Sequence, residues 1–198
     1  MATKQRSYPP LEFHPLTRER WADLEKLFGE RGACGGCWCM YWRLPRAEFD
    51  RRKGQGNKQS MRKLAAAGEA PGILAYAGRE PIGWCAAAPR EQYVRLERSR
   101  VLQRIDDRPV WSVTCLFVKK EHRNRGVSVE LLRAAVAFAR ARGATVVEGY
   151  PVEPKRGKMP DVFAWTGVVS AFKRAGFVEC ARGSPARPIM RFVIREQV

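Results

Sequence analysis

The most constraining feature of this chain is a long β-prone run that leads through a short basic loop into an amphipathic helix. The run covers residues 110–118, the loop residues 119–125, and the apolar stripe of the helix residues 126–142. At such a junction the first helical amides have no partner within the helix, and the helix dipole adds partial positive charge. Gly126 permits a close approach of the backbone, and the lysines and arginines of the loop add full charges. The junction therefore predicts a site for an anion such as a pyrophosphate.

Length and composition indicate one domain. The chain has 198 residues, 45% of them hydrophobic, which suits a single compact domain over residues 1–198. No apolar run approaches the roughly 18 residues of a membrane-spanning helix. The basic N-terminus is not followed by the apolar segment of a secretory signal. We therefore expect a cytoplasmic protein with no membrane partner.

The chain is strongly basic, with 37 Lys and Arg against 20 Asp and Glu and a formal net charge of +17. Such an excess favours a polyanionic partner: nucleic acid, a phosphorylated cofactor or an acidic acceptor. The charges are nevertheless spread along the chain, whereas a dedicated nucleic-acid interface would cluster them. We therefore favour charges on solvated faces over nucleic-acid binding. The same charge is expected to repel a polycationic acceptor at long range.

Hydrophobic periodicity predicts strands and helices on both sides of the junction. Strands are expected at residues 11–14, 73–77, 81–87, 110–118, 144–150, 177–181 and 189–194. Helical segments are expected at residues 17–28, 46–67, 126–142 and 162–175, with Thr17 as the first N-cap. Residues 91–104 are expected to be helix or loop, and residues 151–160 a loop. The strand, helix and strand over residues 110–150 form a crossover unit.

The junction resembles the acetyl-CoA signature of the GNAT N-acetyltransferase superfamily, which is a strand, then Arg/Gln-x-x-Gly-x-Gly/Ala, then a helix. The matching residues are Arg123, Asn124, Arg125, Gly126, Val127 and Ser128, with Ser128 where Gly or Ala is usual. Residues 171–177, Ala-Phe-Lys-Arg-Ala-Gly-Phe, are similar to the family's late helix and the start of the strand after it. The order of the expected elements also agrees, so the resemblance spans nearly the whole chain.

The resemblance implies a single-domain α/β fold with a central mixed, splayed β-sheet and helices on both faces. It implies acetyl-CoA as cosubstrate, bound by two sets of backbone groups. The strand residues Leu116, Phe117 and Val118 would pair with the pantetheine arm, and the amides of Arg123, Asn124, Arg125, Gly126, Val127 and Ser128 would hold the pyrophosphate. An amine, or less often a hydroxyl, would attack the thioester directly. The acceptor would be a small-molecule or protein amine, and a homodimer is compatible with this fold.

Acid and base residues are less well marked. Many family members carry a Tyr on the late helix that protonates the departing thiolate; Phe172, which we expect at the cofactor site, takes that position here. A thiol pKa of about 8.5 makes thiolate a moderate leaving group, whereas an alkylamine of pKa about 10.4 must first lose a proton. Our candidate base is Glu148, in an apolar run where burial would raise its pKa, with an outward-facing strand carboxylate as the alternative. Glu121, His122 and Tyr150 are weaker candidates.

The most unusual segment contains three cysteines, Cys34, Cys37 and Cys39. They are expected to be reduced thiols, since the chain shows no secretory signal. A structural zinc site requires four ligands, and no second pair of cysteines or histidines lies nearby in the sequence to complete it. We therefore expect no metal. A distant fourth ligand such as His14 or Cys85 remains an alternative.

The same segment is rich in aromatic residues, Trp38, Tyr41 and Trp42. Core packing is one interpretation, since Trp, Met and free Cys are commonly buried. The other is a wall of the substrate pocket, where these rings would face a flat or cationic acceptor. The sequence leaves both open.

The sequence thus predicts an acetyl-CoA-dependent N-acetyltransferase that passes an acetyl or short acyl group directly to an amine of unspecified identity. A non-catalytic CoA-binding sensor is the first alternative, because Phe172 cannot act as an acid. A nucleic-acid-binding protein, motivated by the charge of +17, is the second.

Overall fold

A central sheet of seven strands organises the computed structural model, which describes residues 10–153 and 163–194. The strand order is β1-β2-β3-β4-β5-β7-β6, and only the β4–β5 pair is parallel. The strands are β1 (Leu11–Pro15), β2 (Gly72–Ala77), β3 (Glu80–Pro89), β4 (Trp111–Val118), β5 (Val146–Gly149), β6 (Val178–Ser184) and β7 (Arg187–Val193). The mixed α/β fold predicted from the sequence is therefore confirmed.

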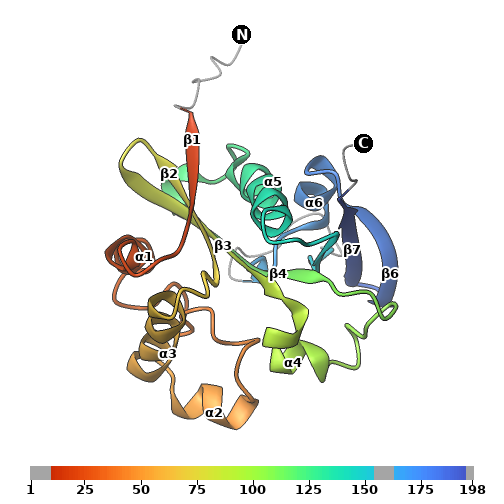
Figure 1. Cartoon of the computed structure of the whole chain (residues 1–198), viewed down its shortest axis with the longest axis horizontal. Helices are drawn as coiled ribbons and strands as arrows, with labels where there is room; N and C mark the ends of the chain where they lie inside the picture. Colours follow the sequence, from red (N-terminus) through yellow and green to blue (C-terminus); the bar gives the residue numbers. More distant parts are fainter. Residues whose placement is uncertain (1–9, 154–162, 195–198) are drawn as a thin grey trace.

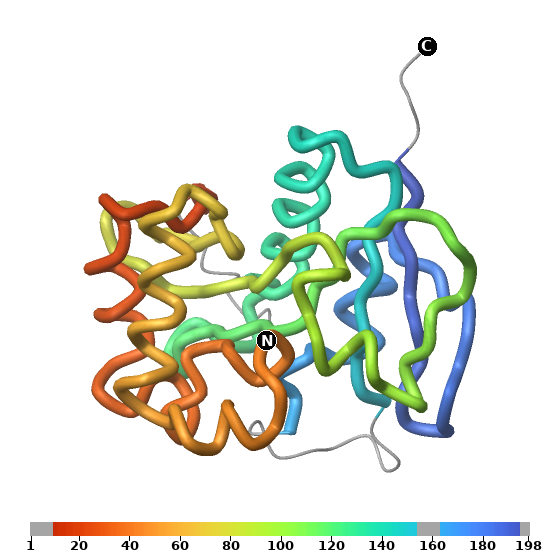
Figure 2. The backbone as a smooth tube through the Cα atoms, turned by 60° about the horizontal axis from the view of Figure 1, so that its bottom comes forward, coloured from red at the N-terminus to blue at the C-terminus, as the bar shows by residue number. Residues whose placement is uncertain are grey.

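Helices cover both faces of this sheet (Figure 1). They are α1 (Trp21–Phe28), α2 (Arg46–Arg51), α3 (Gln55–Ala66), α4 (Val94–Glu97), α5 (Val127–Arg140) and α6 (Val169–Arg174), with 3-10 turns η1 (Arg90–Gln92) and η2 (Lys120–His122). Helix α5 contacts β1 to β4 and also α6, whereas α1 contacts β3. In Figure 2 the N-terminal helices, in red and orange, lie at one side of the molecule and the C-terminal strands, in blue, at the other.

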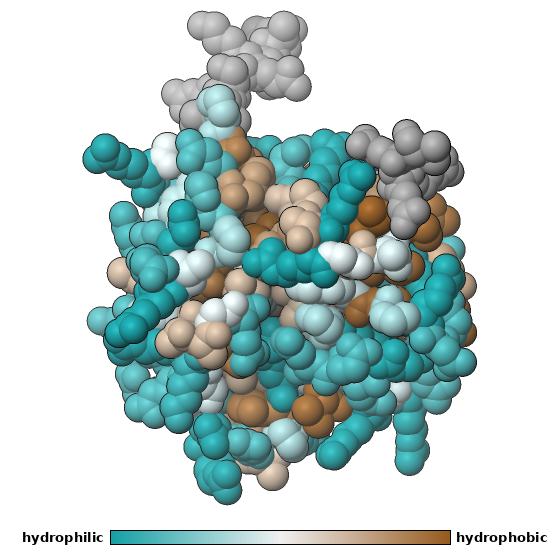
Figure 3. Space-filling view, viewed as in Figure 1, coloured by the Kyte–Doolittle hydropathy of each residue, from teal (hydrophilic) through white to brown (hydrophobic). Residues whose placement is uncertain are grey.

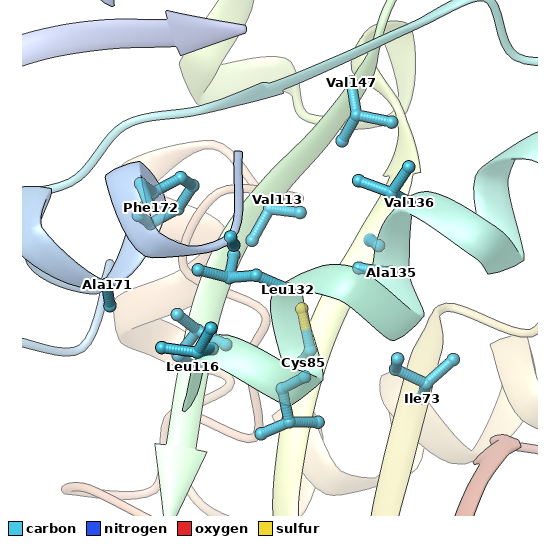
Figure 4. Close-up of a cluster of buried hydrophobic side chains, with 14 of the residues drawn as sticks. Ile73, Cys85, Val113, Leu116, Leu132, Ala135, Val136, Val147, Ala171 and Phe172 are labelled. Carbon is cyan, nitrogen blue, oxygen red and sulfur yellow. The ribbon is translucent and has the colours of Figure 1, made fainter. Parts of the chain in front are cut away.

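Alternation along the central strands builds a core on each face of the sheet. Ile73 and Cys85 point into the core beneath α5 and α6, which Figure 4 shows in close-up. Their neighbours Leu74 and Trp84 point the opposite way, into the core beneath α1 and α3. Both faces of β2 and β3 are thus buried, which fits their nearly continuous apolar sequences.

The sheet splays between β4 and β5. The two strands pair only where Trp111 to Val113 face Val147 to Gly149, although β4 continues to Val118. On its other edge β4 pairs with β3 through a register shift between Ala86 and Ala87, which leaves Thr114 as an extra residue. Such an irregularity bends a strand and increases its twist. The splay expected from the family resemblance is therefore present, and its open part begins after Val113.

Two expected helices differ from the prediction. Thr17 does not cap α1, because α1 begins at Trp21 and Arg20 occupies its N-cap position. The late helix begins at Val169, because Gly167 has a left-handed φ of 84° and Val168 is extended, forming an isolated bridge with Val152. Most of the loop expected at residues 151–160 lies outside the described residues.

The face seen in Figure 3 is largely hydrophilic, interrupted by small apolar groups. Within the part of the chain that the structure describes, no helix is long and apolar enough to cross a membrane.

Candidate active site

A cleft of about 690 Å³ lies where β4, the start of α5 and α6 come together. Its walls come from four parts of the chain: β4, the loop that leads into α5, the segment before and within α6, and the residues after α1. The lining residues are Ala33, Cys34, Leu116, Phe117, Val118, His122, Arg123, Asn124, Gly126, Val127, Ser128, Ala164, Trp165, Val168, Ser170, Ala171 and Arg174. The open part of the splayed sheet therefore faces a cavity large enough for a ligand.

The loop between β4 and α5 reaches the helix through two left-handed residues, Asn124 with φ 57° and Gly126 with φ 82°. Gly126 is the N-cap of α5, and its carbonyl accepts the first helical hydrogen bonds, from Val129 and Glu130. The amides of Val127 and Ser128 thus precede the helical ladder, at the positive end of the helix dipole. A backbone of this shape at the start of a well-formed helix is suited to an anion.

Arg123 stabilises the shape of this loop. Its Nε donates a hydrogen bond to the carbonyl oxygen of Val118, at 3.0 Å. The side chain is half-buried and lines the cleft. Its guanidinium therefore places positive charge between the end of β4 and the start of α5, where the sequence predicts a pyrophosphate.

A second, smaller cavity of about 280 Å³ adjoins the cleft. It shares five wall residues with the cleft: Ala33, Cys34, Leu116, Phe117 and Trp165. The rest of its wall comes from the segment after α1, from α2 and its end, and from β4: Gly35, Cys37, Cys39, Tyr41, Phe49, Lys53 and Cys115. The two cavities thus meet along β4, one with a basic end and the other with mainly apolar walls.

Comparison with known protein families decides the identity of the fold. The model of the Acetyltransferase (GNAT) family matches residues 37–154, more than half of the chain. The chain belongs to the GNAT family. A comparison with curated proteins found no significant match.

Solved acetyltransferase structures share the fold at low sequence identity. The PaiA N-acetyltransferase of Thermoplasma acidophilum, solved with coenzyme A, is 14% identical with a TM-score of 0.53, over 93% of this chain and 99% of its own. A GNAT acetyltransferase of Streptococcus pneumoniae is 14% identical with a TM-score of 0.54, over 94% of this chain and 100% of its own. An acetyltransferase of Thermus thermophilus is 15% identical with a TM-score of 0.50, over 94% of this chain and 99% of its own. Their similarity extends the GNAT fold over nearly the whole chain.

Most of the residues expected at the CoA site line the cleft: Leu116, Phe117, Val118, Arg123, Asn124, Gly126, Val127 and Ser128. Arg125 lies in the same loop but is exposed and outside the lining. Sequence reasoning did not single out Trp165, which was expected within the helix over residues 162–175; it lies instead in the loop before α6 and lines both cavities.

Phe172 lies elsewhere than expected. It is fully buried and packs edge-on against Phe177, with ring centroids 5.0 Å apart, within the core shown in Figure 4. Its ring lies so close to Gly149 that a Cβ there would approach it to 1.9 Å. The residues of α6 that line the cleft are instead Ser170, Ala171 and Arg174. The helix starts later than expected, and the Phe172 ring faces the core and not the cofactor site.

Glu148, the expected base, forms ion pairs with two arginines. Its side chain is 1% exposed. Its Oε1 accepts from Arg191 Nε at 2.7 Å, and its Oε2 accepts from Tyr150 at 2.8 Å and from Arg90 at 3.3 Å. It lines neither cavity. The carboxylate therefore neutralises two buried arginines and lies away from both cavities, an arrangement typical of a structural ion pair.

The network extends beyond Glu148 to the neighbouring strands and loops. Arg191 also donates to both carboxylate oxygens of Asp106, at 2.6 and 2.9 Å. These bonds, together with those from Arg108, hold the pKa of Asp106 well below its usual range. Burial and the nearby Glu148 raise the pKa of Tyr150, which also exchanges a 2.8 Å hydrogen bond with Ser112. The cluster thus joins the neighbouring strands β4, β5 and β7.

The aromatic residues of the unusual segment separate into core and wall. Trp38 is buried, stacked on Trp21 at 5.9 Å, and lines neither cavity. Tyr41 lines the second cavity, where its ring meets Trp165 edge-on at 5.2 Å. Trp42 contacts Tyr41 and Trp165 from behind this wall. Trp38 thus belongs to the core, whereas Tyr41 is part of a cavity wall.

The three cysteines of this segment all belong to a cavity wall. Cys34, Cys37, Cys39 and Cys115 line the second cavity as free thiols. Cys39 Sγ contacts Cys115 Sγ at 3.2 Å and accepts a hydrogen bond from Trp84. Burial raises the pKa of Cys37 to about 12. Among the described residues no group of three or more His, Cys, Asp or Glu is arranged to hold a metal ion.

Proposed function

We propose that this GNAT protein is an acetyl-CoA-dependent N-acetyltransferase that transfers an acetyl group directly to an amine. One observation carries the proposal: a single cleft joins the open edge of β4 to the left-handed loop at the start of α5. The first of these offers backbone groups to an extended chain, and the second offers amides and positive charge to phosphates. CoA has both parts, a pantetheine arm and a pyrophosphate. The coenzyme A bound to the similar PaiA structure is consistent with this assignment.

The residues of the cleft fit such a ligand in chemistry and order. The amides of Val127 and Ser128 and the Arg123 guanidinium would hold the phosphates, and Phe117 and Val118 would line the pantetheine arm. The Leu116 amide already donates to the carbonyl of Trp165 at 2.7 Å, so that residue contributes its side chain. Bound acetyl-CoA would supply an acyl group activated as a thioester.

The acceptor amine would approach from the second cavity, which meets the cleft at Leu116 and Phe117. Direct transfer requires the nucleophile and the thioester to be held together in a water-poor site, and the apolar walls of that cavity serve this purpose. Phe172 has no acidic proton to give to the leaving thiolate, and its ring is buried in the core. A thiolate of pKa about 8.5 can depart without a strong acid, so the arrangement remains compatible with turnover.

The test combines binding with turnover. Acetyl-CoA at saturating concentration is expected to raise Tm, as any ligand specific for the folded state does. Free CoA thiol should then appear in proportion to an added amine in a thiol-colour assay. Binding without thiol release over a broad amine panel would instead indicate a CoA sensor. The absence of any Tm shift would refute the proposal.

A further inference from the structure

We propose that the second cavity binds the aromatic ring of the acceptor, and that this acceptor is a monoamine with no second positive charge. The inference rests on the proposed N-acetyltransferase function and names the substrate class of that site. It starts from a cavity of about 280 Å³ with mainly carbon and sulfur walls. An apolar cavity of about 150 Å³ already holds benzene, so an aromatic ring with small substituents fits here.

The walls are built for a flat apolar group. Tyr41 meets Phe49 at 5.6 Å and Trp165 at 5.2 Å, with interplanar angles of 82° and 74°. These edge-to-face contacts fix the three rings in different planes, so that they present both faces and edges to the cavity. Thiols complete the wall, and sulfur makes favourable contacts with aromatic edges. A planar guest therefore finds aromatic and polarisable surfaces on several sides.

The second cavity opens onto the cleft at the place where an acceptor would meet the thioester. Leu116 and Phe117 of β4, and Trp165 opposite them, belong to both cavities. A ring seated in the second cavity would thus direct a short amine-bearing arm toward the cleft. The reacting groups would then meet along β4, and the bulky part of the acceptor would stay clear of the phosphate end.

The charges around the cavity disfavour an additional cation on the acceptor. Lys53 is part of its wall. The Arg95 guanidinium lies over the Tyr41 ring, 3.7 Å from the centroid, and so occupies one face that a cationic ligand would use. Arg187, half-buried beside Thr166, lies near Tyr41 as well. A second ammonium group would face these cations at short range, which penalises diamines relative to monoamines.

Three amines of similar reach separate these effects: phenethylamine, hexylamine and hexamethylenediamine. With acetyl-CoA as donor, kcat/KM for phenethylamine is expected to exceed that for hexylamine by about tenfold, the scale of apolar-pocket discrimination. Hexylamine should in turn exceed the diamine by a similar factor. Tyr41→Leu should reduce the preference for phenethylamine while leaving the Tm shift by CoA in place.

Charge reversal at the wall provides the decisive comparison. Lys53→Glu should improve kcat/KM for the diamine relative to hexylamine by about threefold or more, since an opposite charge now faces its second ammonium. Lys63→Glu makes the same charge change on an exposed residue of α3 outside both cavities, and should leave the ratio unchanged. Equal effects of the two variants, or a diamine preferred by the unaltered protein, would overturn the inference.

The outcomes also separate this inference from the proposed function. Thiol release with hexylamine or the diamine, but no advantage for phenethylamine, overturns the aromatic site and leaves N-acetyl transfer intact. A preference for hexanoyl-CoA over acetyl-CoA that Tyr41→Leu abolishes would assign the cavity to the acyl chain and overturn the inference. If no amine supports thiol release, the proposed function fails. Binding of phenethylamine, followed by Trp165 fluorescence, then still tests the cavity alone.

Discussion

The backbone amide of Leu116 donates a 2.7 Å hydrogen bond to the carbonyl oxygen of Trp165. This bond lies beyond Val113, where β4 no longer pairs with β5. At Leu116, the loop before α6 thus takes the place that β5 would have as the hydrogen-bond partner of β4. The same loop forms a wall that the two cavities share. The opening that begins after Val113 is therefore partly filled at Leu116, and the end of β4, next to the loop that leads into α5, is left facing the cleft.

Trp165 should report on occupancy of both cavities. CoA is expected to change the intrinsic fluorescence of the protein, because the Trp165 indole is half-exposed and lines the cleft. Trp165→Phe should lose most of that change while its carbonyl still accepts the bond from Leu116. Trp111→Phe is the matched control, since Trp111 packs on Phe138 away from the cleft. A signal that survives Trp165→Phe would contradict this placement of the ligand.

Arg123 should be important for CoA affinity. Arg123→Ala removes a charge-assisted contact to a phosphate and the bond to Val118, so Kd for CoA should rise by about tenfold or more. Arg123→Lys should recover part of the affinity. Arg140→Ala, with the same charge change at the exposed far end of α5, should leave Kd nearly unaltered. Calorimetric titration measures all three, and similar losses at Arg123 and Arg140 would mean that only net charge matters.

Bound CoA should protect the Cys34 thiol from alkylation. It is exposed and lines both cavities, whereas Cys180 is also exposed, on β6, and lies outside them. Iodoacetamide labelling followed by peptide mass spectrometry should show both thiols modified in the free protein. Saturating CoA should slow labelling of Cys34 by about tenfold and leave Cys180 unchanged. Cys37 should react slowly in either state, because burial raises its pKa to about 12. Unaltered labelling of Cys34 would place CoA elsewhere.

The strand-to-helix junction was predictable because its determinants are local. A β-prone run, a glycine that accepts a positive φ and a helical apolar stripe all lie within residues 110–142. The orientation of Phe172 was not predictable in the same way. Periodicity indicates that α6 has a buried face, but the side that faces the core depends on the start of the helix, which Gly167 and Val168 set.

The ion-pair partners of Glu148 could not be predicted from the sequence either. An acidic residue in an apolar strand is compatible with a catalytic base, an exposed carboxylate or a buried ion pair. Its partners Arg90 and Arg191 lie 58 and 43 positions away and meet it only through the pairing of β5 with β7 and the turn after β3. In a chain with 37 basic residues, no local pattern singles out these two.

Glu148→Gln should therefore act mainly on stability. It removes the counter-charge that the buried Arg90 and Arg191 share but leaves them Glu97 and Asp106 as their other partners, so the unfolding free energy should fall by about 2 kcal/mol. Glu130→Gln breaks an exposed pair with Arg133 on α5 and should cost less than about 1 kcal/mol. Urea unfolding measures both. A Glu148→Gln protein that kept its stability but lost turnover would restore the residue as a candidate base.

Asp106 should contribute to the acid sensitivity of the fold. Its hydrogen bonds with Arg191 and Arg108 hold its pKa in the folded state well below the unfolded value of about 3.9. A lowered pKa stabilises the folded state above that unfolded value, and the contribution disappears as the pH falls further. The unfolding free energy should thus decrease progressively as the pH falls from about 5 through 3 and below, and less steeply in Asp106→Asn, which cannot titrate there. Asp50→Asn, which alters only an exposed pair with Arg46, is the control and should keep the original slope. Equal slopes for Asp106→Asn and the unaltered protein would show that Asp106 is not held in this network in solution.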